Sequence, residues 1–358
     1  MRVLFCSATT WLALSMSTVC MRAAETPRPA LLVLSKSAHT LAIVDPQTLH
    51  VVARMPSGPD PHEVIASEDG KTAYISNYGG GAYNTLTVVD LVVQKTTGAI
   101  DLGALRGPHG LEAAGGKIWF TAEGAKAVGR YDPATKKIDW ILGTGQDRTH
   151  MIFVFPDLAH FVTTNISSAT LTIAEKKPPR APGPPPGMSP GGPNPPMQGP
   201  DPHEPRPAPQ PNWEETVVTV GRGAEGFDLS PDRTEIWAAN AQDGTISIVD
   251  VASRKAVQTL NADVKGANRL KFTPDGQLVF VSSLGGSDVA ILDAHTREVK
   301  KRVKIGHGAA GIQMQPDGAR AFVACTPDNY VAVIDLKSLE VTGHLDAGGG
   351  PDGMAWVK

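Results

Sequence analysis

One sequence unit recurs along the whole chain, and its spacing is the strongest constraint on the fold. The units begin 41 to 47 residues apart, except for one gap of 75. Such a period is typical of repeat architectures in which each small unit packs on its neighbours. The starts align as PHEVIASEDG (61–70), PHGLEAAGGK (108–117), THMIFVFPDL (149–158), AEGFDLSPDR (224–233), ANRLKFTPDG (267–276), AAGIQMQPDG (309–318) and PDGMAWVK (351–358).

Each unit reads as four short strands. The tetrapeptides SEDG, SPDR, TPDG and QPDG predict a tight turn after the first apolar run. A second apolar run follows, such as KIWFT, EIWAA or LVFVS. We expect the aromatic residues of these runs, Trp119, Trp237 and Phe280, to pack between sheets. A third, alternating run ends in Asp, as in TLTVVD (85–90) and TISIVD (245–250), which favours an Asx turn into a fourth strand. Four strands per unit describe a propeller blade in an all-β protein.

The two ends of the chain predict seven blades and the way the ring closes. The last unit stops after its first strand, GMAWV, whereas residues 31–55 hold three strands and lack a first one. Together they complete one blade, so six full units and one shared blade make seven. Closure by strands from both termini removes the open sheet edge that a linear array would expose. The propeller is expected to span residues 31–358.

The repeat resembles that of the YVTN family of seven-bladed β-propellers, and within it the YncE-like exported bacterial proteins. The shared pattern is Gly-Pro-His-Gly, an apolar strand, Pro-Asp-Gly, an aromatic or β-branched strand and Val-Ile-Asp, seen best in the units that start at 108, 267 and 309. The second unit departs from it with Ala114-Gly115-Gly116 in place of Pro-Asp-Gly, and the third has Ile173-Ala174 in place of the Asp. The resemblance implies a repeat-built propeller and no particular enzyme.

The first residues and the composition bear on location and partners. Residues 1–24 have the basic start, apolar middle and small residues of a signal peptide, so we expect a periplasmic or secreted protein with no membrane span after its removal. That segment holds Cys6 and Cys20 and leaves Cys325 alone, which excludes an internal disulfide. The formal charge is −3 without any basic tract, so a nucleic-acid partner is not expected. We expect a monomer.

A proline-rich insert interrupts the third full unit at residues 177–212. Proline occupies 16 of the 34 positions from Pro178 to Pro211. Prolines lack the N–H donor that a sheet requires, so we expect polyproline II or disorder between the third and fourth strands. A tolerated surface insertion is favoured over a docking arm.

The second residue of each unit should stand in a ring at one mouth of the central channel. Three adjacent blades supply imidazoles and the next supplies a carboxylate, which are ligand types for a divalent metal such as Zn²⁺ and also suit a general base. The predicted metal ligands are His62, His109, His150 and Glu225, with His109 and Glu225 as candidate catalytic residues. The alternative is a structural role in hydrogen bonding between blades. The ring is completed by Asn268, Ala310 and Asp352.

Further candidates for ligand binding lie beside this ring. They either follow the second strands, whose exits share the same mouth, or adjoin the ring and could pair with a charged ligand. For each of them a solvated loop position is the competing interpretation. The ligand-binding set is Glu63, Asn77, Glu123, Asn240, Asn268, Arg269 and Asp352, with Tyr78 and Asn165 at equivalent loops.

Two functions remain open at this point. The first is a non-enzymatic exported propeller that binds a small molecule or an envelope protein at its channel mouth, favoured because GxSxG, P-loop and CxxC motifs are missing from the sequence. The second is a metal-dependent lyase or hydrolase that uses the His/Glu cluster. No cofactor is certain from the sequence beyond the divalent metal of that hypothesis. The CxxCH signature of covalent haem does not occur.

Overall fold

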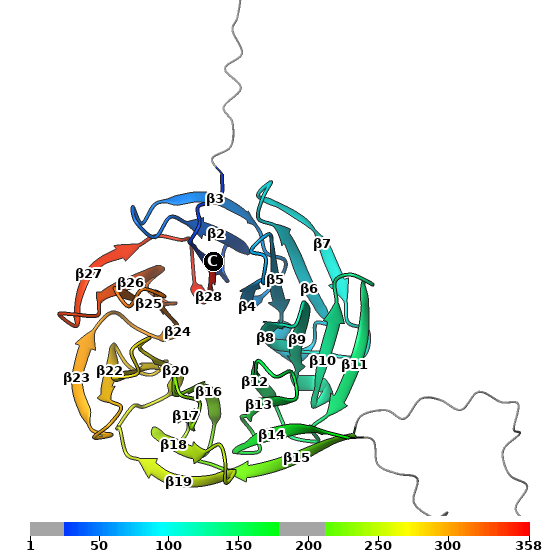
Figure 1. Ribbon diagram of the computed structural model, residues 1–358. Coiled ribbons are helices and arrows are strands. Elements are labelled where there is room, and N and C mark those ends of the chain that lie inside the picture. The colour runs from blue at the N-terminus through cyan, green and yellow to red at the C-terminus, as the bar shows by residue number, and fades with distance from the viewer. Residues whose placement is uncertain (1–24, 179–211) are drawn as a thin grey trace, which may run out of the picture.

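The computed structural model describes residues 25–178 and 212–358, which form seven four-stranded antiparallel blades around a central channel (Figure 1). The expected signal peptide and nearly all of the proline-rich insert lie outside the described residues. Two short 3-10 turns, η1 (Gly79–Gly81) and η2 (Glu123–Ala125), are the only helical elements in the described part. The expected all-β, seven-bladed propeller is confirmed.

In every blade the strands follow one another outward from the channel. The inner strands are β4 (Pro61–Ala66), β8 (Pro108–Ala114), β12 (Thr149–Val154), β16 (Ala224–Leu229), β20 (Ala267–Phe272), β24 (Ala309–Met314) and β28 (Pro351–Val357). The second strands are β5 (Thr72–Asn77), β9 (Lys117–Ala122), β13 (His160–Asn165), β17 (Glu235–Asn240), β21 (Leu278–Ser283), β25 (Arg320–Cys325) and β1 (Ala30–Ser35).

The outer half of each blade is built from the remaining strands. The third strands are β6 (Thr85–Asp90), β10 (Ala127–Asp132), β14 (Thr170–Lys177), β18 (Thr245–Asp250), β22 (Asp288–Asp293), β26 (Tyr330–Asp335) and β2 (Thr40–Val44). The fourth strands are β7 (Lys95–Asp101), β11 (Lys137–Gly143), β15 (Asn212–Thr219), β19 (Lys255–Leu260), β23 (Val299–Lys304), β27 (Glu340–Leu345) and β3 (Val51–Pro56).

The local chemistry of the turns explains why the unit repeats. In the first hairpin Gly276 N donates to Thr273 O at 2.8 Å, and Gly276 has φ +72°, a conformation that glycine adopts without strain. After the third strand the Asp carboxylate accepts backbone N–H groups of the next loop, as Asp90 does from Val92 at 2.8 Å and Val93 at 3.0 Å. These Asx turns lead into the fourth strands, as the repeat predicts.

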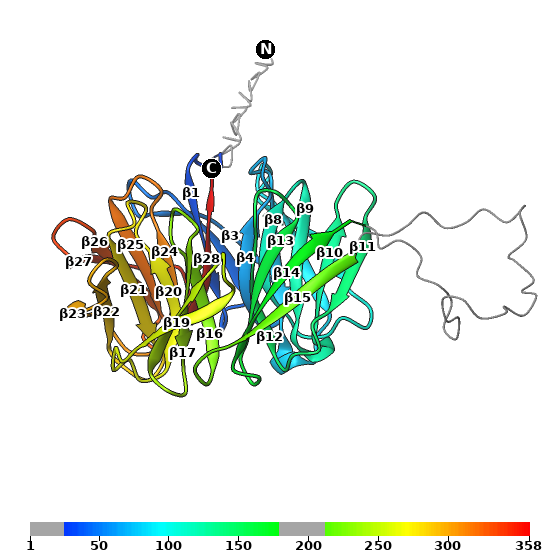
Figure 2. The same ribbon diagram turned by 60° about the horizontal axis from the view of Figure 1, so that its bottom comes forward.

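The ring closes through the two ends of the described chain. β28 pairs antiparallel with β1, with Leu31 opposite Trp356 and Val33 opposite Met354. Figure 2 shows β28 running through the disc and ending at one of its faces. Trp356 also donates from its ring N–H to Met314 O of the preceding blade at 2.6 Å. The closing blade is therefore built from both ends of the described chain and is tied to the preceding blade.

The core lies between adjacent blades. The largest fully buried side chains include Trp119, Trp237 and Phe280, at the second-strand positions that the repeat predicts for packing between sheets. Inner strands, by contrast, turn part of their residues to the channel, and those residues form the site described next.

Candidate functional site

All seven ring residues predicted from the repeat lie around one mouth of the channel. They line a cavity of about 340 Å³ together with residues from the adjoining loops. The ring members that line it are His62, His109, His150, Glu225, Asn268, Ala310 and Asp352. The repeat thus brings three imidazoles and two carboxylates to one opening.

Where glycine is the third residue of an inner strand, the neighbouring inner strand can lie very close to it. A Cβ on Gly110 would lie 2.5 Å from His150 O, and one on Gly311 would lie 2.2 Å from Asp352 O, so only glycine permits this approach of neighbouring inner strands. A hydroxyl then locks the contact, because Thr121 Oγ1 accepts from Gly110 N at 2.9 Å and donates to His150 O at 2.5 Å. The Pro-His-Gly motif therefore places its histidine on a tightly held frame.

The residue before each inner strand has a positive φ. Glycine occupies this position in five blades, as Gly107, Gly223, Gly266, Gly308 and Gly350. The two exceptions are Asp60, with φ +43°, and Arg148, with φ +55°. A side chain in this conformation costs of order 1 kcal/mol or more, and such strain tends to persist where the side chain has a function. Both exceptions flank the imidazoles.

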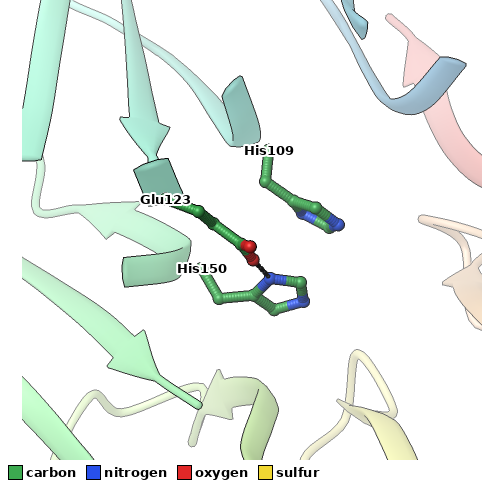
Figure 3. Close-up of side chains that lie close together, drawn as sticks. All are labelled: His109, Glu123 and His150. Carbon is green, nitrogen blue, oxygen red and sulfur yellow. Dashed lines mark hydrogen bonds and ion pairs between the residues drawn. The ribbon is translucent and has the colours of Figure 1, made fainter. Parts of the chain in front are cut away.

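Three side chains form the compact centre of the site, His109, Glu123 and His150 (Figure 3). One ligand atom from each lies within 4.8 Å of the others, and all three residues are buried. The two imidazoles are neighbours, with ring centroids 3.7 Å apart. His109 and His150 come from adjacent inner strands, and Glu123 comes from η2, directly after the second strand β9.

Glu123 holds His150 from one side. Its Oε1 bonds to His150 Nδ1, while its Oε2 accepts from the Tyr78 hydroxyl at 2.6 Å and from Arg148 Nε at 3.2 Å. Burial favours the neutral acid, but the His150 hydrogen bond and charge, with Tyr78 and Arg148, outweigh it and keep the pKa of Glu123 below its usual value. The carboxylate therefore orients the His150 ring.

Glu225 lies at the other nitrogen of His150. His150 Nε2 is 2.9 Å from Glu225 Oε2, an ion-pair distance, but the carboxylate lies off the N–H direction and no hydrogen bond is formed. Burial opposes charge on Glu225, yet His150 and Arg269 lower its pKa to about 2. For His150 itself, burial is outweighed by Glu225 and Glu123, and its pKa is raised above the ordinary 6.5.

His109 is in the opposite electrostatic state. It is only 3% exposed, and its Nδ1 has no hydrogen-bond partner among the described residues. Burial, and then the positive charge of His150, lowers the pKa of His109 well below 6.5. A neutral imidazole with a free nitrogen therefore stands beside one whose carboxylate neighbours favour its protonated form.

His62 is near this centre but is engaged differently. Its ring lies 5.1 Å from that of His109, and its Nε2 accepts from Lys36 Nζ at 2.8 Å. Lys36 in turn pairs with Asp352 at 3.0 Å. Burial and the Lys36 charge lower the pKa of His62. The structure therefore brings His109, His150 and Glu225 together and sets His62 in a separate pair with Lys36.

Other residues predicted from the sequence are divided between the cavity and the blades. Asn268, Arg269 and Asp352 line the cavity, and Arg269 is paired with Glu63 at 2.5 Å. Asn77 and Asn240, however, are fully buried inside their blades. Asn77 donates to Ser57 O at 3.0 Å, and the Asn240 amide lies 3.0 Å from Ser247 Oγ. Asn165 is bonded in the same way to Thr172 at 2.9 Å.

Two cavity residues, Lys36 and Arg148, are missing from the sequence-based candidates although the repeat contains their signals. Lys36 directly follows the second strand of the closing blade, at the position that Tyr78 and Glu123 occupy in the next two. Arg148 stands where most units have glycine. In either case the signal is a departure from the repeat at a position that faces the channel mouth.

This arrangement suits metal coordination. Imidazole nitrogens and carboxylate oxygens are ligands of Zn²⁺ and of neighbouring divalent transition metals. A carboxylate that holds the second nitrogen of a ligating histidine, as Glu123 holds His150, is the usual support for such a ligand. Arg148 uses only its Nε in the pair with Glu123, so its two Nη groups have no hydrogen bond to the described residues. They can bind a carboxylate beside the imidazoles.

Comparison with known proteins identifies the fold and no family. No protein-family model and no curated protein matches the chain. Among solved structures, a functionally unknown protein from Desulfotomaculum acetoxidans superposes with a TM-score of 0.70 at 12% identity, over 91% of this chain and 98% of that one. A putative 6-phosphogluconolactonase from Bacteroides uniformis gives 0.68 at 14% identity, over 92% and 99%.

A third structure, dihydro-heme d1 dehydrogenase NirN in complex with DHE, gives a TM-score of 0.60 at 15% identity, over 91% of this chain and 74% of that one. At such identities the likeness is one of fold alone. The chemistry of this propeller therefore has to be argued from its own residues. No helix in the described part of the chain is long and apolar enough to cross a membrane.

Proposed function

We propose that this protein is a metal-binding propeller. His109, His150 and Glu225 hold one divalent transition metal of the zinc class at the channel mouth, and Glu123 holds the other nitrogen of His150 in place. The observation that carries the proposal is the buried Nδ1 of His109, which has no partner among the described residues although it belongs to a cluster of ligand atoms within 4.8 Å. A buried polar atom without a partner is costly, and a metal ligand bond would remove that cost.

The ligand class follows from the cavity beside the metal. With about 340 Å³ it is large enough for a small molecule, and its free hydrogen-bond donors are the Nη groups of Arg148. We infer that a small carboxylate or another oxoanion binds there, with one oxygen on the metal and one on Arg148. Asn268 at the opposite side of the ring offers a neutral amide for its remaining polar atoms.

A binding role is favoured over catalysis. In the alternative, a metal-dependent lyase or hydrolase, Glu225 or His109 would act as the base for a reacting proton. With a pKa of about 2, Glu225 is a weak base near neutrality, far from the value that general-base catalysis favours. His109, with its low pKa, is likewise better suited to be a neutral ligand than a proton carrier.

The setting of this function is also a proposal. The segment 1–24 supports export to the periplasm or beyond, where the isolated Cys325 requires no disulfide partner. Membership of the YVTN family, and of its YncE-like exported branch, is supported by the repeat and by the propeller fold. An envelope protein is the alternative ligand for the same mouth.

Zinc titration of the purified protein, followed by calorimetry, tests the metal proposal. We expect one Zn²⁺ per chain with a Kd below about 1 μM, and a loss of about 100-fold or more in His109→Ala. His50→Ala, which changes an exposed histidine far from the channel, is the matched control and should bind like the wild type. Binding no tighter than about 1 mM in the wild type would contradict the proposal.

A further inference from the structure

A second and larger cavity occupies the other part of the channel. It has a volume of about 670 Å³ and is formed by the middle and final residues of the inner strands, towards the face at which β28 ends. Arg269 lines both cavities, so its ion pair with Glu63 lies at the boundary between them. This cavity does not include the imidazoles of the metal site.

The charged side chains of this cavity are satisfied, with one exception. Glu63 pairs with Arg269 at 2.5 Å, and Asp228 pairs with Lys271 at 3.3 Å. The Glu68 carboxylate accepts the N–H groups of Gly115 at 3.2 Å and Gly116 at 2.7 Å. Lys358, at the end of the chain, is exposed.

The exception is Glu112 on β8, in the wall of the cavity. Its carboxyl makes no hydrogen bond or ion pair with any described residue. Burial raises the pKa of Glu112 to about 7, although Lys271 partly offsets the effect. The side chain is only partly covered, and its carboxyl faces the cavity without a partner among the described residues, so a ligand in the cavity can reach it.

Between these charged and polar groups the wall carries apolar and adaptable side chains. Leu111, Met151, Phe227 and Met354 are among the residues that line it. Methionine side chains are flexible and polarisable, so they fit ligands of varied shape. The volume lies within the range of small-molecule sites, which combine apolar walls with a few polar groups that fix orientation.

We propose that this cavity binds a small molecule with an apolar or aromatic body and a single amine, whose ammonium group pairs with the Glu112 carboxylate. A cation is the favoured partner because the other acidic side chains of the wall already have partners, whereas Glu112 has none among the described residues. A neutral polar ligand would leave the carboxylate uncompensated, and an anion would be repelled by Glu112 and Asp228. The site is independent of the metal proposed at the opposite mouth.

Calorimetry of the whole protein with three probe amines tests this inference. We choose phenethylamine, tryptamine and benzylamine, and expect at least one to bind with a Kd of about 100 μM or tighter. The uncharged 2-phenylethanol and the anionic 3-phenylpropionate should bind at least tenfold more weakly. Binding should also release protons at pH 7, because the ammonium converts the protonated fraction of Glu112 to carboxylate, and buffers of different ionisation enthalpy measure this release.

Glu112→Gln keeps the shape of the side chain and removes its charge. It should weaken amine binding at least tenfold and abolish the proton release. Glu340→Gln, an exposed change on β27 with the same loss of charge, is the matched control and should leave binding unchanged. Equal binding of an amine by the wild type and Glu112→Gln, or no binding of any of the three amines up to about 10 mM, overturns the inference. Zinc titration is a separate readout, so failure at this cavity would leave the metal proposal standing.

Discussion

Arg148 shows how a single departure from the repeat can mark a site. Its backbone has φ +55°, where five other blades carry glycine, so the side chain is kept at a conformational cost. What it supplies is a guanidinium that pairs with Glu123, which in turn orients His150. Asp60 does the same beside His62, since its carboxylate accepts Gly79 N at 2.8 Å. Arg148 thereby joins the side chains of the site, whereas Asp60 holds the backbone of the neighbouring turn η1.

Arg148→Gly tests that relation. Glycine relieves the left-handed strain, which is worth about 1 kcal/mol, and the partly exposed pair with Glu123 contributes little to stability. We expect a free energy of unfolding equal to or slightly above that of the wild type, together with zinc affinity about tenfold lower because Glu123 loses a partner. Chemical denaturation and zinc titration of the same samples measure both. A clear loss of stability with unchanged zinc affinity would assign Arg148 a purely structural role.

Glu112 should impose a pH dependence on stability. Its pKa is about 7 in the folded chain and 4.5 when unperturbed, so the folded state binds the proton more tightly between these values. The contribution of Glu112 to the free energy of unfolding is therefore full below about pH 4.5. It falls as the pH rises towards 7, by up to about 3 kcal/mol. In Glu112→Gln this contribution to the fall should disappear, so the variant should be the more stable protein at pH 8. The difference between the two denaturation curves at pH 4 and pH 8 measures it, and a constant difference would contradict the assignment.

At the scale of strands, the alternation of side chains decides which of the predicted residues lie in the site. The last residue of a second strand, such as Asn77 or Asn240, turns into its blade, whereas the next residue, Tyr78 or Lys36, faces the channel mouth. The repeat predicts the strand ends correctly but cannot resolve this one-residue difference. From the sequence, Glu123 can be placed only in a loop near the mouth. Its contact with His150 depends on the 3-10 turn η2 and on the direction of its side chain.

The inner strands are easier to predict than these loops. Their ring positions follow from one register that the whole chain shares, so the repeat alone is enough to place His109, His150 and Glu225 together. The separation of His62 from that group does not follow from the repeat. Lys36 follows β1 of the closing blade, and its pairing with His62 of the next blade is a tertiary contact. Unpaired atoms such as His109 Nδ1 are likewise visible only in three dimensions.

Removing part of β28 tests the closure of the ring. Deletion of 353–358 takes away the buried Met354 and Val357 and most of the pairing with β1. Burial of two such side chains is worth about 4 kcal/mol, so the thermal midpoint should fall by roughly 10 °C or the protein should fail to fold. Deletion of Lys358 alone is the control and should change little. An unchanged midpoint in the longer deletion would mean that β28 does not hold the ring together.

At the scale of the whole molecule, the propeller offers one channel with two chemically different ends. The imidazoles and carboxylates lie at one mouth, and the larger cavity with Glu112 lies towards the other, with the Glu63–Arg269 pair between them. The sequence predicts the number of blades and the strand order because turn chemistry and apolar period repeat in every unit. It does not predict the second cavity, which arises where residues from all seven inner strands face one another.

The central claim is that a metal sits between His109 and His150. Anomalous diffraction at the zinc absorption edge, from crystals grown with zinc, tests it most directly. We predict one strong peak at the channel mouth, about 2.0 to 2.2 Å from a nitrogen of each of these imidazoles and from a carboxylate oxygen of Glu225. Absence of a peak at the mouth, with His109 Nδ1 still lacking a partner, would contradict it.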